Sequence, residues 1–145
     1  MTPGEPTGEV PAELRARIAG DPWGATLGIE LLTLGPGYCR AAMRLAPAMR
    51  NFHGDPHGGA IFSLADYAFA AACNAHGEPA VALTVTVQYL VAAPPGARLI
   101  AEARAERQGQ RAGFYEMVVT DETGARIAVC RAVSLRRGAA SPARG

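Results

Sequence analysis

A single carboxylic acid, Asp66, lies inside a segment of apolar residues that otherwise predicts a buried helix. The helix is expected from about Gly58 to Asn74, and it carries no Lys or Arg. Burying a carboxylate is unfavourable unless the group is paired with a cation or has a chemical task. Asp66 is therefore either a structural acid, held by an Arg or by a backbone group, or a general base or nucleophile at the wall of a cleft. Its apolar neighbours are Ile61, Leu64, Ala65, Ala68 and Phe69.

Two glycines, Gly58 and Gly59, open the same helix. The first N–H groups of a helix have no internal acceptor, and with the helix dipole they favour an oxygen that carries negative charge. Glycine also lets a ligand approach the backbone closely, although a tight turn alone would explain the pair. Combined with Asp66, the pair predicts an acyl-transfer site, in which N–H donors polarise a carbonyl and a carboxylate attacks it or activates water.

The spacing of the acid and the donors restricts how such a site can be built. Asp66 follows Gly58 by two helical turns, so the two lie roughly 12 Å apart along one helix at about 1.5 Å per residue. That distance is too long for both groups to act on one carbonyl carbon. The sequence therefore predicts a homo-oligomer, at least a dimer, in which Asp66 of one copy serves the helix start of another.

Other kinds of site find less support in the sequence. His53, Asp55 and His57 could suggest a metal site, but a glycine and a proline between them break any helix that would align them, and no further ligand completes the set. We therefore expect no metal. Ser63 and Ser134 lie in no strained nucleophile turn, and no Gly-rich phosphate loop is present. No cofactor is expected.

The composition is that of a globular protein with one domain. Of the 145 residues, 49% are hydrophobic and 19% are charged, which allows a sizeable core. The net charge of +1 gives no reason to expect nucleic acid or a membrane as a partner. No apolar run approaches the roughly 20 residues of a membrane span, and the first residues lack the pattern of a signal peptide. The 3 cysteines, without close spacing, fit a reducing compartment, so we expect a cytoplasmic protein.

The order of the expected elements predicts the fold class. Residues 1–10 are expected to be a flexible N-terminus and residues 138–145 a disordered tail, with a single domain over 11–137. Strands grouped around one helix predict an α+β domain, in which an antiparallel sheet wraps around one apolar helix. A first helix is expected over 11–18, ending at 20–22, and strands over 28–35, 37–46, 79–91, 97–109, 112–124 and 125–137.

The segment 51–74 resembles the phenylacetic-acid-degradation (PaaI-like) thioesterases of the hotdog fold, and the likeness extends over about 27–135. This family's fold, a curved antiparallel β-sheet around a central α-helix, agrees with the architecture expected above. Its members are dimers or tetramers with the active site between subunits. The resemblance therefore implies a homodimer or homotetramer that hydrolyses acyl-CoA thioesters, with phenylacetyl-CoA and its ring-hydroxylated relatives as substrates. The residues that carry it are Asn51, His57-Gly58-Gly59, Leu64-Ala65-Asp66 and Asn74.

The resemblance also implies a role for each matching site residue. The Gly58 N–H would polarise the thioester carbonyl, with Gly59 beside it at the substrate. Asp66 from the partner chain would act as nucleophile or general base. Asn51 would position the attacking water or hold the thioester, and His57 would orient the loop or the carbonyl.

The chain departs from the family pattern after the helix. Many relatives carry Arg-Pro where this chain has Val91-Ala92. We expect Arg111, in a turn at 110–113, to bind the CoA phosphates instead, because Arg suits phosphate, although an ordinary solvated charge would also explain it. Thr84 is expected to line the acyl site, on a strand face that alternation also gives to Ala82, Thr86 and Gln88, although an ordinary polar face of the sheet would also explain it.

Three other functions are compatible with a hotdog domain, because fold does not fix function. Hydratases of this fold place a His five residues after the catalytic Asp, where this chain has Ala71. A non-catalytic acyl-CoA-binding module would need no carboxylate at the site, and neither would a purely structural oligomer. We therefore expect an acyl-CoA thioesterase, with the non-catalytic module as the alternative.

Overall fold

The computed structural model describes residues 8–138. Most of the predicted flexible N-terminus and of the predicted disordered tail, residues 1–7 and 139–145, lies outside the described residues. The described helices are α1 (Ala12–Ala19), α2 (Pro22–Leu27), the 3-10 helix η1 (Pro47–Met49) and α3 (Gly58–Asn74). The strands are β1 (Glu30–Gly35), β2 (Tyr38–Arg44), β3 (Ala80–Tyr89), β4 (Arg98–Gln108), β5 (Ala112–Thr120) and β6 (Arg126–Arg136).

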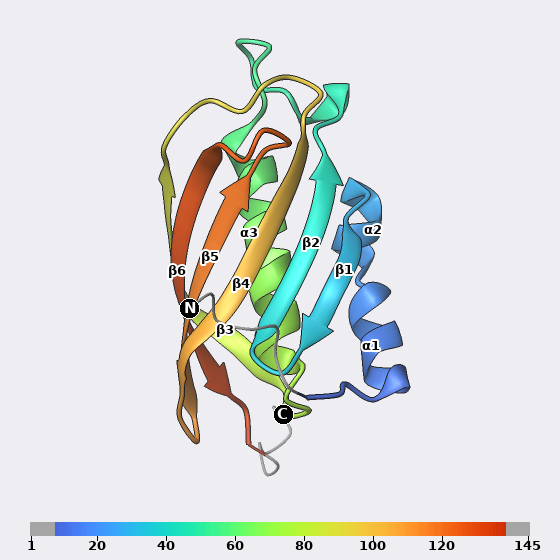
Figure 1. The fold of residues 1–145 in the computed structure, drawn as a ribbon, viewed down its shortest axis with the longest axis vertical. Coiled ribbons are helices and arrows are strands. Elements are labelled where there is room, and N and C mark those ends of the chain that lie inside the picture. Colours follow the sequence, from blue (N-terminus) through green and yellow to red (C-terminus); the bar gives the residue numbers. More distant parts are fainter. Residues whose placement is uncertain (1–7, 139–145) are drawn as a thin grey trace, which may run out of the picture.

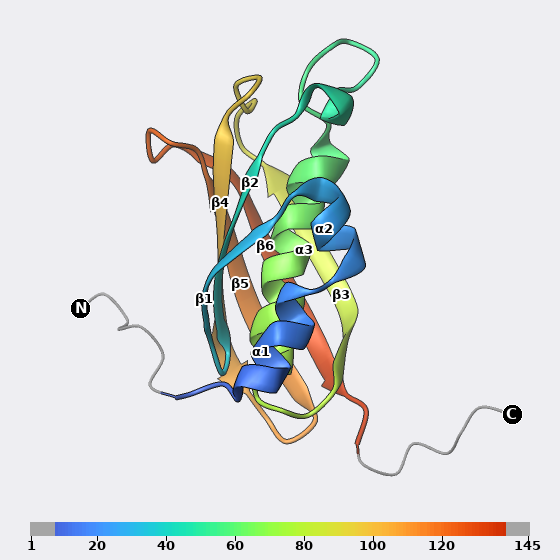
Figure 2. The same cartoon turned by 90° about the vertical axis from the view of Figure 1, so that its right-hand side faces the viewer.

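The six strands form one antiparallel sheet in the order β1-β2-β4-β5-β6-β3. The sheet curves around α3, which lies along its concave face, while α1 and α2 lie beside α3 near β1 (Figures 1 and 2). The predicted α+β architecture, a sheet around one apolar helix, is therefore confirmed. Within residues 8–138, no helix is both long and apolar enough to cross a membrane.

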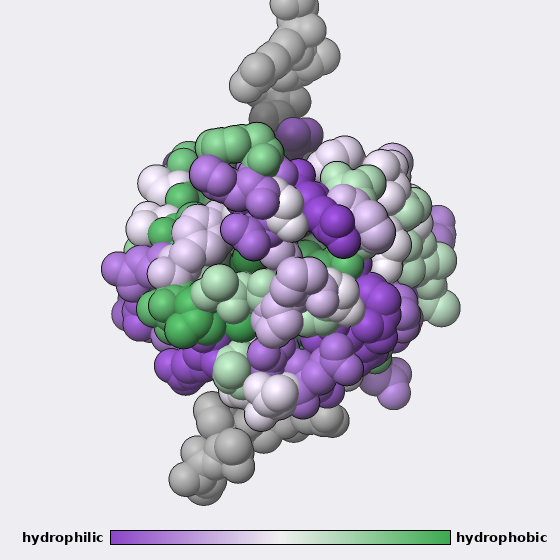
Figure 3. Space-filling model, turned by 90° about the horizontal axis from the view of Figure 1, so that it is seen from above, coloured by the Kyte–Doolittle hydropathy of each residue, from purple (hydrophilic) through white to green (hydrophobic). Residues whose placement is uncertain are grey.

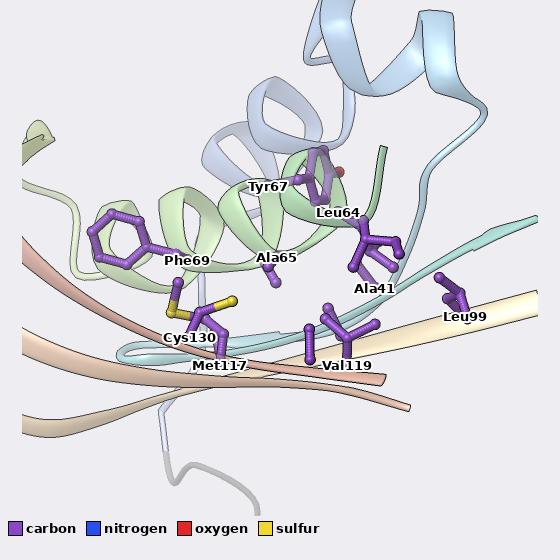
Figure 4. Packing of buried hydrophobic residues seen from close by; sticks show 14 of the residues in the cluster. Ala41, Leu64, Ala65, Tyr67, Phe69, Leu99, Met117, Val119 and Cys130 are labelled. Atoms are coloured by element: carbon purple, nitrogen blue, oxygen red, sulfur yellow. The ribbon is translucent and has the colours of Figure 1, made fainter. Parts of the chain in front are cut away.

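Small side chains bring α3 close to the sheet. Buried alanines of α3, with Leu64 and Phe69, face buried residues of the sheet such as Met117 and Cys130 (Figure 4). Close packing of this kind leaves no room for larger side chains without strain. It fixes the direction of α3, and hence the two ends of the helix on which the predicted site depends. All three cysteines, Cys39, Cys73 and Cys130, are buried and unpaired.

The short helix α2 was not expected from the sequence. The segment at 20–22 was interpreted as the end of the first helix, but Asp21 also begins a new one: its side chain accepts a hydrogen bond from the Gly24 N–H at 2.8 Å, and Pro22 follows at the first helical position. Both features favour a helix start. Gly24 packs against Tyr67 of α3, where a Cβ would come within 2.7 Å of the ring. The contact holds α2 against α3.

Asn74, at the last position of α3, ties the helix to β3. Its amide donates to the carbonyls of Ala70 at 2.9 Å and Ala80 at 3.2 Å, and its side-chain oxygen accepts from the Ala80 N–H at 2.9 Å. The side chain thus satisfies backbone groups at the end of a helix and the start of a strand. Asn74, one of the residues that carry the family resemblance, is a positioning residue for α3.

Replacing Asn74 by Ala should therefore destabilise the fold. Leaving partly buried backbone groups of Ala80 without partners is expected to lower the free energy of unfolding by about 1–3 kcal/mol. Thr26→Ala is the matched control, because it removes one exposed hydrogen bond, from Thr26 to the Pro22 carbonyl, and should change stability by less than about 0.5 kcal/mol. Urea unfolding of both variants measures the difference, and equal effects would contradict this role of Asn74.

Candidate active site

Asp66 lies half-buried in a cleft between α3 and the α1–α2 pair, here called the α1–α3 cleft, of about 390 Å³. The cleft is lined by, among others, Ile18, Asp21, Trp23, Ser63, Asp66 and Tyr67. Within residues 8–138, the Asp66 carboxylate makes no hydrogen bond and no ion pair. The structural interpretation, an acid held by an Arg or by a backbone group, therefore has no support in a single chain. Asp66 is an unpaired carboxylate at the wall of a cleft.

The surroundings of Asp66 make its carboxyl a better proton acceptor. Burial raises the pKa of Asp66 above its ordinary value, and the negative charge of Asp21 raises it further. Asp21 lines the same cleft and is held in place as the N-cap of α2. A carboxylate with a raised pKa is better matched to general-base chemistry near neutral pH than an exposed one.

Gly58 lies in a second hollow, here called the Gly58 hollow, of about 440 Å³, lined by residues including Asn51, Ile61, Tyr89 and Leu90. Figure 3 views the end of the molecule where α3 begins, and hydrophobic and polar side chains are mixed there. Within residues 8–138, the Gly58 N–H donates to no acceptor. Tyr89 donates its hydroxyl to the Gly58 carbonyl at 2.9 Å, and a Cβ on Gly58 would come within 3.1 Å of the Tyr89 ring. Glycine at this position permits that close approach.

His57 is the N-cap of α3. Its Nδ1 accepts a hydrogen bond from the Gly59 N–H at 2.8 Å, so the neutral ring carries its proton on Nε2. Gly59 is therefore already satisfied by His57, and the Gly58 N–H is left as the free donor of the pair. His57 thus contacts the start of α3 through Gly59, and its role in orienting the loop or the carbonyl stays a prediction. Among the described residues, no three His, Cys, Asp or Glu side chains gather as a metal site would require.

Asn51 organises the loop that precedes α3. Its side-chain oxygen accepts from the N–H groups of His53 at 2.9 Å and Asp55 at 3.1 Å, and its own N–H donates to the Asp55 carbonyl at 2.7 Å. With its oxygen engaged in the loop, the side-chain NH₂ remains to donate into the Gly58 hollow. Asn51 is thus suited to hold a carbonyl oxygen, one of the two roles that the resemblance implies.

Thr84 and Arg111 lie away from both hollows. A bulge in β3 shifts the pairing with β6 between Ala82 and Thr84, so Ala82 pairs with Ser134 while Thr84 pairs with Val133. The predicted common face of Ala82 and Thr84 is therefore wrong. Thr84 lies on the outer face of the sheet, opposite to α3, where within one chain it cannot line either hollow. Arg111 is exposed in the turn between β4 and β5, at the end of the sheet opposite to the start of α3 (Figure 1).

A single chain does not bring the predicted acid and donor together. Asp66 lines the α1–α3 cleft, whereas Gly58 and Asn51 line the Gly58 hollow. Asp21 and Trp23, which line the α1–α3 cleft with Asp66, were not predicted from the sequence. The signal that could have placed Asp21 there is the Asp-Pro pair, which marks a helix start as readily as the end of the preceding helix.

Comparison with known proteins agrees with the resemblance found in the sequence. Residues 53–128 match the model of the thioesterase superfamily. The chain is 35% identical over 123 residues to the acyl-coenzyme A thioesterase PaaI of Escherichia coli K12, covering 85% of this chain and 88% of that protein.

Solved structures are similar over the same region. The structure of the E. coli PaaI protein from the phenylacetic acid degradation operon matches with a TM-score of 0.82 at 35% identity, over 86% of this chain and 90% of that one. A mutant of the phenylacetic acid degradation protein PaaI from Thermus thermophilus matches with a TM-score of 0.77 at 35% identity, over 80% of this chain and 99% of that one. The predicted hotdog fold is thereby confirmed.

The unpaired carboxylate should lower the stability of the folded chain, so Asp66→Asn is expected to raise the midpoint of thermal unfolding at pH 7 by a few degrees. The pKa of Asp66 is raised by folding, so above that pKa the ionised group favours the unfolded chain. Below the ordinary value of about 3.9, both states are protonated and the difference should vanish.

Thermal unfolding from about pH 3 to pH 8 measures this effect and covers the range in which the difference should vanish. Asp55→Asn, at an exposed carboxylate without a side-chain partner among the described residues, is the matched control. An Asp66→Asn variant that is less stable than the wild type at pH 7 would show that the carboxylate has a structural partner after all.

Proposed function

The chain belongs to the thioesterase superfamily and is an acyl-CoA thioester hydrolase, and we propose that it releases the free acid and CoA from phenylacetyl-CoA, hydroxyphenylacetyl-CoA or a related aryl or medium-chain acyl-CoA. The main support for this proposal is that, among residues 8–138, the Asp66 carboxylate in one cleft and the Gly58 N–H in another have no hydrogen-bond partner. The names of the E. coli and T. thermophilus relatives, which refer to phenylacetic acid degradation, support the aryl substrate.

We propose that two copies of the chain complete each active site. β3 lies at the end of the strand order, so its outer edge has no partner strand among residues 8–138. It is long and exposed, with Leu83 56% and Tyr89 50% accessible, and a long apolar edge of this kind is a template for pairing with another strand. The other edge strand, β1, is short and packs with α1. We therefore propose a dimer in which the β3 strands of two copies pair about a two-fold axis. A tetramer would require a further interface.

Such a pair gives the geometry that one chain lacks. Pairing of β3 with its own copy about a two-fold axis runs the two strands antiparallel, and the two α3 helices with them. The start of one α3 is then directed toward the middle of the other, where Asp66 lies. The same symmetry turns the β4–β5 turn of one copy toward the end where α3 of the other begins, so Arg111 could reach the CoA phosphates across the interface.

The chemistry follows from these positions. The Gly58 N–H, with the Asn51 side-chain NH₂ beside it, donates to the thioester oxygen as negative charge develops on it. Asp66 of the other copy either takes a proton from water, which attacks the carbonyl carbon, or attacks that carbon itself. When Asp66 has activated water, the C–S bond breaks and the CoA thiolate takes the proton that Asp66 accepted. When Asp66 has attacked the carbonyl carbon itself, the thiolate leaves and takes a proton from solvent, and water then hydrolyses the acyl anhydride on Asp66 to the free acid and the carboxylate. No metal or cofactor is needed beyond the CoA of the substrate, and the buried, unpaired cysteines fit a cytoplasmic enzyme.

Removing the proposed base or nucleophile should abolish turnover. Asp66→Asn is expected to lower kcat by about 10²-fold or more while the fold persists. Thiol release from a panel of aryl- and alkyl-CoA thioesters measures the loss and identifies the preferred acyl group. Tight binding of acyl-CoA without turnover in either protein would instead indicate a non-catalytic binding module.

Two substitutions at Gly58 separate the loss of its N–H from the gain of a side chain. Gly58→Pro removes the donor at the first helical position, where proline is tolerated, whereas Gly58→Ala keeps the N–H and makes the same Cβ contact with Tyr89. Loss of an oxyanion donor should lower kcat about 10²-fold in the Pro variant, and the Ala variant should stay within about threefold of wild type. Equal activity of the two variants would exclude the Gly58 N–H as a donor in the reaction.

A further inference from the structure

Trp23 is an exposed aromatic side chain whose position is nevertheless fixed. The indole is 58% accessible, and its Nε1 donates to the Ser63 Oγ at 3.2 Å. The Ser63 hydroxyl in turn donates to the Gly59 carbonyl at 2.9 Å. This chain of hydrogen bonds links the indole to the first turn of α3. A large apolar ring held at the surface in one orientation is a preorganised contact for a ligand.

The helix that carries Trp23 is itself held against α3. Asp21 caps α2, and Gly24 packs directly on the Tyr67 ring of α3. Trp23 and Ser63 therefore form one end of a cleft with fixed walls. Ser63 precedes Asp66 by one helical turn, so both side chains point from the same face of α3, and both line the cleft with Trp23.

The cleft suits an apolar group of moderate size. Its volume of about 390 Å³ lies in the range of small-molecule sites. Leu14 and Ile18 of α1 add aliphatic surface to the indole, and Ala70 and Ala71 of α3 leave room between the walls. A planar ring can lie against the indole face, where an aromatic pair adds to the stabilisation from burial.

We propose that Trp23, held by Ser63, is the specificity-determining residue of this thioesterase: its indole forms the wall of the acyl subsite in the α1–α3 cleft and favours planar acyl groups. The inference rests on the proposed function, because the acyl group enters this cleft only if Asp66 is the group that acts on its thioester. Trp23 is a binding residue, so its effect is expected mainly in KM and in the choice between substrates.

Two substitutions test this role with phenylacetyl-CoA and hexanoyl-CoA as substrates. Trp23→Leu keeps apolar bulk but removes the ring, and Trp23→Phe keeps a ring without the N–H. We expect Trp23→Leu to lower kcat/KM for phenylacetyl-CoA about fivefold or more, through KM, with less than about twofold change for hexanoyl-CoA, whereas Trp23→Phe retains most of the preference. Equal losses for both substrates, or no loss for either, would overturn the proposal.

Binding of non-hydrolysable analogues gives a second readout, independent of turnover. The chain contains 1 Trp, so tryptophan emission, excited selectively over tyrosine, reports Trp23 alone. We expect S-phenethyl-CoA, a thioether, to change the emission and to bind more tightly than S-hexyl-CoA by calorimetry, with the preference lost in Trp23→Leu. Binding of S-phenethyl-CoA that leaves the emission unchanged, or no preference between the two thioethers, would overturn the proposal.

The two readouts distinguish failure of this inference from failure of the proposed function. A protein that binds S-phenethyl-CoA against Trp23 but hydrolyses no thioester would retain the aryl subsite and refute hydrolysis of the proposed substrates. A protein that hydrolyses phenylacetyl-CoA with the same selectivity in wild type and Trp23→Leu would retain the proposed function and refute the role of Trp23.

Discussion

The distance between an acid and a helix start on the same helix is the constraint on which the other features of this protein depend. Asp66 and Gly58 are both set by α3, and the rigid helix keeps them two turns apart. Each lies in its own hollow, and each has a group without a partner among residues 8–138: a carboxylate in one and an N–H in the other. In the proposed dimer, the carboxylate of one copy meets the N–H of the other.

Other parts of the fold hold the Asp66 carboxylate and the Gly58 N–H in position. The alanine-rich face of α3 lies close to the sheet, and Asn74 fastens the end of the helix to β3. In the part of the chain that the structure describes, the outer edge of β3 has no partner strand and carries exposed apolar side chains, and the proposed dimer pairs two copies through it. The short helix α2, capped by Asp21, forms the wall of the cleft beside Asp66. Burial raises the pKa of the Asp66 carboxyl, and the negative charge of Asp21 raises it further. β3 therefore has two roles: it anchors the end of α3 through Asn74, and it is the edge strand of the proposed dimer.

The sequence predicted the sheet, the central helix and the separation of Asp66 from Gly58, because each depends on local patterns of apolar residues and on helix geometry. It did not predict α2, since Asp21-Pro22 follows the end of one helix and also begins the next, and the pair is as typical of a helix end as of a helix start. It also misplaced Ala82 relative to Thr84, because a bulge in β3 breaks the alternation on which that face was assigned. The α1–α3 cleft, with Trp23 as a wall, arises from the packing of helices distant in sequence, which periodicity does not reveal.

Mixing two inactive variants tests the shared active site most directly. Gly58→Pro chains lack the donor and Asp66→Asn chains lack the acid, so each alone should be almost inactive. In a mixed dimer, one of the two sites combines an intact Gly58 with an intact Asp66, and random pairing should restore about a quarter of wild-type activity. Recovery at that level would support an active site shared between subunits. No recovery, when exchange of subunits between the two variants is demonstrated by differential tagging, would contradict it.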